Sequence, residues 1–110
     1  MKLSIVQFTP VFGEKQENFR RLSAHSEQID ADVIVFPELC TTGYFFQSKE
    51  ESRSYAETTE GETGDFFRSV AQEHDAMVVA GFVEKEGDNV YNSALIVSPN
   101  APVQIGRAHV

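Results

Sequence analysis

The chain has 110 residues, a formal net charge of −8, 41% hydrophobic residues and 24% charged residues. That length suits one small domain with one core, and the composition is that of an ordinary globular protein. The negative charge disfavours nucleic acid and anionic membranes as partners, because binding to them relies on Lys and Arg to neutralise phosphate. We therefore expect a globular protein that binds neither nucleic acid nor membrane.

The compartment is predicted from the cysteine content and the N-terminus. A single cysteine, Cys40, excludes a disulfide within the chain and fits a reducing environment. Residues 1–10 lack the long apolar run of a signal peptide. No stretch approaches the roughly 20 apolar residues that span a bilayer. We expect a soluble, cytoplasmic protein.

The first third of the chain predicts a strand, a helix and a second strand. The first strand begins at Leu3 and ends near Pro10. Residues 13–30 are polar and predict a helix, because apolar positions recur at spacings of three and four. These positions are Phe19, Leu22, Ser26 and Ile29. Residues 33–36 are continuously apolar, which predicts a strand buried on both faces and ended by Pro37.

The remaining chain predicts two helices and a hairpin. Residues 38–64 are irregular, with a short helix around positions 49–55. A longer helix is predicted to begin near Thr63, a candidate N-cap, with Asp65 in its first turn. Its apolar face consists of Phe66, Phe67, Val70 and Ala71. Two apolar runs separated by turn residues predict a hairpin over residues 78–97.

This order of elements predicts an α/β fold with a layered sheet. The strand and helix pattern stops after Val97. We therefore expect the last strand to be an unpaired edge and one side of the sheet to be uncovered, an arrangement that proteins normally avoid. The chain is interpreted as part of a domain.

The last six residues, 105–110, match the translation of a common sequencing-library adapter. We expect natural sequence to end near Val103, so that residues 1–103 are the protein and residues 104–110 are a tail of foreign origin. Arg107 and His109 are accordingly given no role. Different codons across residues 105–110 in the coding DNA would contradict this interpretation.

Glu38 is the main catalytic candidate. It follows a predicted buried strand, and ligands of α/β proteins gather at the carboxyl ends of strands. We expect the side chain to be half-buried beside apolar groups, which would raise its pKa toward that of a general base. The alternative is a solvated carboxylate at a strand exit.

The residues around Glu38 resemble the signature of the nitrilase, or carbon–nitrogen hydrolase, superfamily. Four blocks agree in order and extend from about Lys2 to Asn100. They are Gln7 with Pro10, Gly13 and Asn18; 36–39 with 42–44; 81–84; and 91–94. The resemblance is specific to the superfamily and covers its N-terminal part, but it does not select a substrate.

The resemblance implies a partial α-β-β-α sandwich and a Glu–Lys–Cys triad. Glu38 occupies the position of the glutamate, the general base. It would take the proton of a cysteine thiol, whose thiolate attacks an amide, nitrile or carbamoyl carbon. No cofactor or metal is implied, and family members commonly form homo-oligomers. The triad lysine and cysteine have no counterpart in this chain, so we expect it to be inactive alone.

Other chemically capable residues are predicted to be structural. Cys40 would share a face with Glu38 if the strand continued, but a small, partly buried cysteine is the favoured interpretation. Lys85 is predicted to be solvated near the hairpin turn. His25 and His74 lack metal-ligand spacing, so helix-end or surface roles are favoured.

Two further residues are placed near the site. Tyr44 is an equal candidate for loop packing and for an aromatic wall of the substrate pocket. Asn92 is expected to hold its strand near the site. Two alternative functions stay open: the glutaminase domain of an NAD synthetase-like enzyme, and a non-catalytic interaction fragment.

Overall fold

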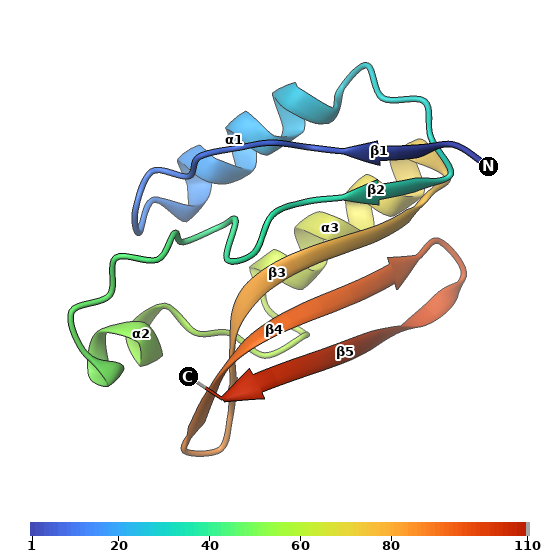
Figure 1. Cartoon of the computed structure of the whole chain (residues 1–110). Coiled ribbons are helices and arrows are strands. Elements are labelled where there is room, and N and C mark those ends of the chain that lie inside the picture. The colour runs from blue at the N-terminus through green and yellow to red at the C-terminus, as the bar shows by residue number, and fades with distance from the viewer. Residues whose placement is uncertain (110) are drawn as a thin grey trace.

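The computed structural model describes residues 1–109, in which five strands form one mixed sheet in the order β1-β2-β3-β4-β5 (Figure 1). Strands β1, β2 and β3 are parallel to one another, and the β3–β4 and β4–β5 pairs are antiparallel. The bounds are β1 Leu3–Ile5, β2 Val33–Val35, β3 Met77–Glu86, β4 Asn89–Ser98 and β5 Ala101–His109.

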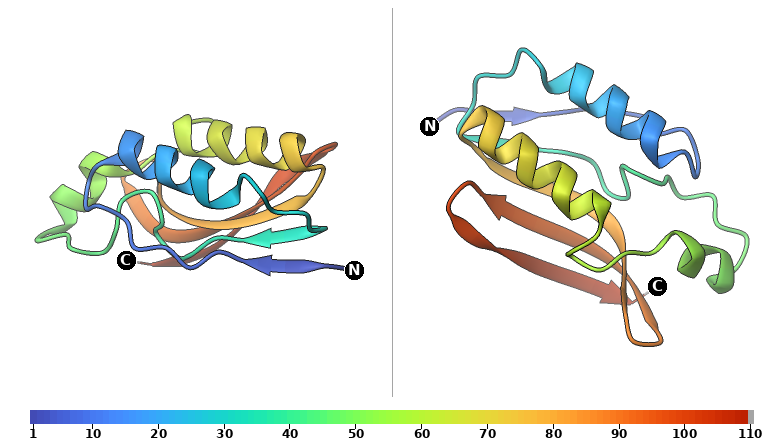
Figure 2. Two further views of the ribbon diagram at one scale, coloured as in Figure 1. Left: turned by 90° about the horizontal axis from the view of Figure 1, so that it is seen from above. Right: turned by 180° about the vertical axis from the view of Figure 1, so that it is seen from behind.

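The helices are α1 Lys15–Ser26, α2 Lys49–Tyr55 and α3 Glu62–His74. Parallel neighbours require crossover connections, and α1 and α3 lie in the two crossovers of β1, β2 and β3. Crossovers of the same hand that advance in the same direction place their helices on the same side. Accordingly, α1 and α3 cover one face of the sheet, as the edge-on view in Figure 2 shows. We call this the covered face and its opposite the open face.

The main core lies between these helices and the covered face. Leu22 of α1 and Phe67 of α3 are fully buried against Ile34, Val78 and Leu95 of the sheet. The two helices also contact each other, because Phe19 stacks on Phe66 with ring centroids 4.7 Å apart. The helical periodicity read from the sequence therefore identified the faces that pack.

The open face is apolar but uncovered by any element of residues 1–109. Side chains alternate along a strand, so the register partners Leu3, Val33 and Met77 share this face. Leu3 is 60% exposed and Ile5 is 68% exposed. The prediction that the second strand is buried on both faces is wrong, since Val33 and Val35 are only half-buried.

The start of α3 differs from the prediction. Thr63 is not the N-cap: α3 begins at Glu62 after Gly61, and Thr63 lies in the first turn. The Glu57 carboxylate caps the helix from outside, because Oε1 accepts from the Thr63 amide at 2.8 Å. Glu57 Oε2 also accepts from the Thr63 hydroxyl at 2.6 Å and pairs with Lys15 Nζ at 2.9 Å.

The sequence pattern predicted that the edge of β4 is unpaired. This prediction is wrong, because β4 is paired with β5. Arg107 on β5 donates to the buried Glu84 carboxylate from Nε at 2.7 Å, and the Ser93 hydroxyl donates to the same oxygen at 2.7 Å. Arg107, to which the sequence analysis assigned no role, therefore contacts Glu84 and Glu86. The origin of residues 104–110 as a foreign tail stays a prediction.

No helix within residues 1–109 is long and apolar enough to cross a bilayer.

Candidate active site

The backbone at Glu38 lies over the open face of β3. On either side of it the chain stays paired with β3, because Phe36 N donates to Val79 O at 2.7 Å and Cys40 N donates to Gly81 O at 3.3 Å. A Cβ at position 81 would stand 2.6 Å from Glu38 Cα. Glycine is therefore required at position 81 for the Glu38 backbone to lie this close to the strand.

A tight turn follows Glu38 and fixes its position. Leu39 adopts a left-handed φ of 46°, and Gly43 N donates to Leu39 O at 2.8 Å. The buried Asn18 of α1 donates to Thr41 O at 2.9 Å and also bonds the backbone of Val11. The turn is thus tied to the first helix by the Asn18 amide, which the sequence indicated only through the family resemblance.

The Glu38 carboxylate is exposed on the open face, where Asn92 Nδ2 donates a hydrogen bond to its Oε1. Asn92 reaches it from β4, where it is the register partner of Val83 on β3. The prediction that Glu38 is half-buried is wrong for this chain, because no element of residues 1–109 covers the open face above it. The structure does bring Glu38 and Asn92 together, as a carboxylate and the amide that orients it.

Cys40 lies on the other side of the sheet. Its side chain is fully buried in the core under the helices, with Sγ 3.7 Å from Gly81 O. Burial raises the pKa of the Cys40 thiol to about 12. The left-handed residue Leu39 breaks strand alternation, so Glu38 and Cys40 do not share a face. Cys40 is therefore a core residue, and a fully buried neutral thiol cannot serve as a nucleophile.

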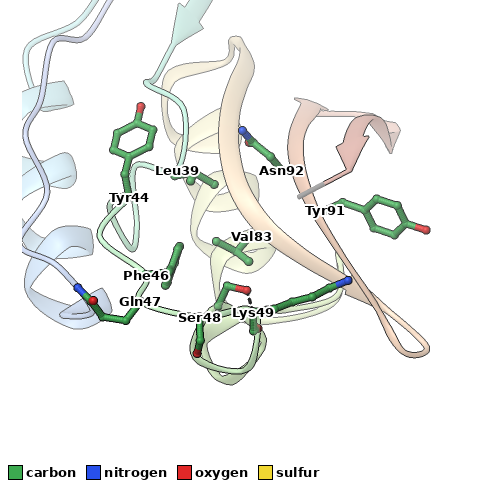
Figure 3. Close-up of a pocket in the computed structure, with 10 residues that line it drawn as sticks. Leu39, Tyr44, Phe46, Gln47, Ser48, Lys49, Val83, Tyr91 and Asn92 are labelled. Carbon is green, nitrogen blue, oxygen red and sulfur yellow. Dashed lines mark hydrogen bonds between the residues drawn. The ribbon is translucent and has the colours of Figure 1, made fainter.

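A hollow of about 460 Å³ adjoins Asn92 (Figure 3). It is lined by Leu39, Tyr44, Phe46, Gln47, Ser48, Lys49, Ser52, Val83, Tyr91 and Asn92. Tyr44 is 54% exposed. The pKa of its hydroxyl is raised, chiefly by partial burial and to a lesser extent by the negative charge of Glu38. Tyr44 thus lies near Glu38 and lines a hollow of ligand size that Glu38 itself does not line; its contact with a substrate stays a prediction.

The other candidates lie away from this hollow. Lys85 is exposed on β3. His74 places Nδ1 3.2 Å from Ile29 O, and His25 packs edge-on against Phe8 with ring centroids 5.6 Å apart. Both histidines lie in the last turns of their helices, in agreement with the favoured interpretation. Within residues 1–109, no group of three or more His, Cys, Asp or Glu side chains is arranged to hold a metal ion.

The sequence matches the family described as carbon-nitrogen hydrolase over residues 2–109. The chain belongs to this family. A nitrilase of Pyrococcus abyssi is 38% identical over 103 residues, which cover 90% of this chain and 39% of that protein. A protein N-terminal amidase of Schizosaccharomyces pombe is 32% identical over 111 residues, again with 90% and 39% covered. The chain thus spans about two-fifths of the length of these relatives.

The same fold is found in a solved crystal structure. The crystal structure of an N-terminal amidase superposes with a TM-score of 0.89 at 24% identity, covering 96% of this chain and 27% of that one. The predicted fold class, α/β of the carbon–nitrogen hydrolase type, is therefore confirmed. What residues 1–109 contain is one helix layer and one sheet.

Proposed function

We propose that this carbon–nitrogen hydrolase chain is part of an amidase-type enzyme that cleaves a small, non-peptide C–N bond, with Glu38 as the general base. The observation that supports this most is the placement of Glu38: it is exposed, hydrogen-bonded by Asn92, and lines a hollow of about 550 Å³ over β3, β4 and β5 that Asn92 also lines. A carboxylate in that setting can exchange protons with a group bound in the hollow.

The proposed reaction follows the Glu–Lys–Cys scheme that the family resemblance implies. Glu38 takes the proton of a cysteine thiol, and the thiolate adds to the amide carbon. A lysine stabilises the charge that develops on the substrate oxygen. Glu38 returns this proton to the leaving nitrogen, so that ammonia or an amine departs and a thioester remains. Glu38 then takes a proton from water as that water attacks the thioester, and it gives this proton to the cysteine sulfur when the acid is released. We place this lysine and cysteine in further sequence of a longer protein, since Cys40 is buried.

The proposal is tested in the longer reading frame that contains residues 1–103. Glu38→Gln should lower kcat by about 10²–10⁴-fold, the range that general-base steps contribute. Glu50→Gln is the matched control: it removes the same charge from an exposed position on α2 and should leave kcat unchanged. Unchanged turnover of amides by the Glu38→Gln variant would refute the proposed role.

The 110-residue chain alone should hydrolyse neither amides nor nitriles. Without an accessible thiol there is no group from which Glu38 can remove a proton to make the nucleophile. Measurable release of ammonia by the purified chain, abolished by Glu38→Gln, would contradict this expectation and require a different mechanism.

The finer assignments are part of the same proposal. The substrate is a small amide, nitrile or carbamoyl compound, the complete enzyme is a homo-oligomer, and it acts in the cytoplasm without a cofactor. The glutaminase alternative has weaker support, because a glutamine-dependent NAD(+) synthetase of Acinetobacter baylyi is only 26% identical over 112 residues. An ATP-binding domain in the longer reading frame would favour it. A non-catalytic fragment predicts no effect of Glu38→Gln on activity.

A further inference from the structure

The turn that follows Glu38 is held by side chains of the two helices that cover the sheet. Thr41 of this turn is buried, and its carbonyl oxygen accepts from the Asn18 amide of α1 at 2.9 Å. The Thr41 hydroxyl lies 3.4 Å from the hydroxyl of Thr63, which is buried in the first turn of α3. The turn that carries the catalytic candidate is therefore fixed by two buried polar side chains, one from each helix.

Glu57 determines the direction of the hydrogen bonding at Thr63. Its carboxylate can only accept, and it accepts from the Thr63 amide at 2.8 Å and from the Thr63 hydroxyl at 2.6 Å. A threonine hydroxyl has one proton, so the proton of Thr63 is committed to Glu57. The oxygen of Thr63 is then left to accept from the hydroxyl of Thr41. Glu57 therefore holds the Thr63 hydroxyl in the orientation in which Thr41 can donate to it.

The Glu57 carboxylate is itself fixed by Lys15 of α1. The Lys15 ammonium lies 2.9 Å from Glu57 Oε2 and donates to the carbonyl of Tyr55, the last residue of α2, at 2.7 Å. Only 15% of the Lys15 side chain and 11% of the Glu57 side chain are exposed, so solvent screens this pair weakly. The Glu57 backbone is also bound to β3, because its amide donates to Val83 O at 2.9 Å. Helix α1, the end of α2 and β3 are thus joined at Glu57.

We propose that Glu57 is a positioning residue for Glu38, acting through Thr63 and Thr41. The inference rests on the proposed function, because it assumes that Glu38 is the general base. Glu57 lines neither the hollow beside Tyr44 nor the hollow over β3, β4 and β5, so it should affect the rate of the chemical step and not substrate binding. A misplacement of about 1 Å at a catalytic group can lower the rate by about 10²-fold.

The first test replaces Thr63 in the full-length protein. Thr63→Val keeps the shape and the backbone amide but removes the hydroxyl between Glu57 and Thr41. It should lower kcat about 2- to 10-fold with KM unchanged, and Thr63→Ser, which keeps the hydroxyl, should retain the kcat of wild type. Ser26→Ala is the matched control, because it removes another buried hydroxyl at the far end of α1. Its kcat should equal that of wild type.

Glu57→Gln should have a larger effect than Thr63→Val. An amide of the same shape has one acceptor and one donor where the carboxylate has two acceptors. Either orientation of this amide turns its NH₂ group toward the Thr63 amide or toward the Lys15 ammonium. We expect kcat to fall about 10- to 100-fold. Removal of one member of a buried ion pair also destabilises the fold, so the Thr63 variants decide the test if Glu57→Gln does not fold.

The Glu38→Gln background separates positioning of Glu38 from a general loss of folded protein. If Glu57 acts through Glu38, Thr63→Val should cause no further loss of the residual turnover of Glu38→Gln. A further loss by the same factor as in wild type would overturn the inference, because the Thr63 hydroxyl would then support folding alone. Wild-type kcat in both Thr63→Val and Glu57→Gln would overturn it as well.

Amide hydrogen exchange separates this inference from the proposed function, because it needs no turnover. Gly43 N donates to Leu39 O at 2.8 Å within the turn, so Thr63→Val should speed exchange of the Gly43 amide about 2- to 10-fold, and Ser26→Ala should not. Unchanged turnover in Glu38→Gln refutes the proposed function, and exchange then decides the inference alone. Faster exchange confined to Thr63→Val upholds the positioning of the turn, and equal exchange in both variants overturns it.

Discussion

The two faces of the sheet carry different kinds of residues. On the covered face, Phe67, Leu22 and Cys40 are fully buried beneath two helices. On the open face, Leu3 and Ile5 are exposed and Glu38 is accessible. Glu38 and Cys40 are two positions apart in sequence, yet one faces solvent and the other the core. Stability in this chain therefore resides on one face of the sheet and the candidate chemistry on the other.

The largest effect on stability should come from truncating a core side chain beneath the helices of the covered face. Phe67→Ala removes a fully buried ring from the main core and should lower the free energy of unfolding by about 3–5 kcal/mol. Leu3→Ala on the open face, where the side chain is mostly exposed, should change it by less than about 0.5 kcal/mol. Urea unfolding of the 110-residue chain measures both. Equal losses for the two variants would contradict the division between the faces.

Gly81→Ala tests the close contact between β3 and the backbone of Glu38. The added methyl group would stand 2.6 Å from Glu38 Cα, and its three nearest atoms all belong to the backbone, which cannot move aside cheaply. We expect a loss of about 1–3 kcal/mol in the free energy of unfolding. Gly106→Ala is the control, because a Cβ at position 106 meets nothing within 4 Å. A neutral Gly81→Ala variant would show that the Glu38 backbone is not held against β3.

The pH dependence of stability tests the burial of the Cys40 thiol. Burial raises the thiol pKa from 9.0 to about 12, so the unfolded chain loses this proton before the folded chain does. The stability that the neutral thiol contributes is complete below pH 9 and falls as the pH rises toward 12, by up to about 1.4 kcal/mol per pH unit. Wild type should therefore lose stability more steeply than Cys40→Ala in this window. Parallel curves would indicate an accessible thiol.

Asn92 is expected to give the smallest effect. Asn92→Ala removes the donor to Glu38 Oε1, and a net hydrogen bond contributes about 0.5–1.5 kcal/mol. In the full-length protein kcat should fall by roughly 2- to 10-fold. Asn89→Ala, at the exposed start of β4, is the matched control and should retain full activity. No difference between the two variants would mean that Asn92 does not orient the carboxylate.

Local patterns in the sequence determined most of the elements. The short helix over residues 49–55 was predicted with the bounds of α2, and Ser48 caps it by accepting from the Glu51 amide at 3.0 Å. Apolar spacing in α3 identified Phe67 and Val70 as core residues. The end of the second strand at Pro37 identified the next residue, Glu38, as the catalytic candidate. Signals of this kind act within a few residues, so the sequence displays them directly.

Tertiary structure alone decided which groups meet. The face that Glu38 occupies depends on a glycine 43 positions later in the chain and on the left-handed turn at Leu39. The burial of Cys40, the capping of α3 by Glu57 and the pairing of β4 with β5 likewise join residues that no local pattern connects. The physical reason is that burial and hydrogen-bond partners are set by contacts through space, which the sequence around each residue does not contain.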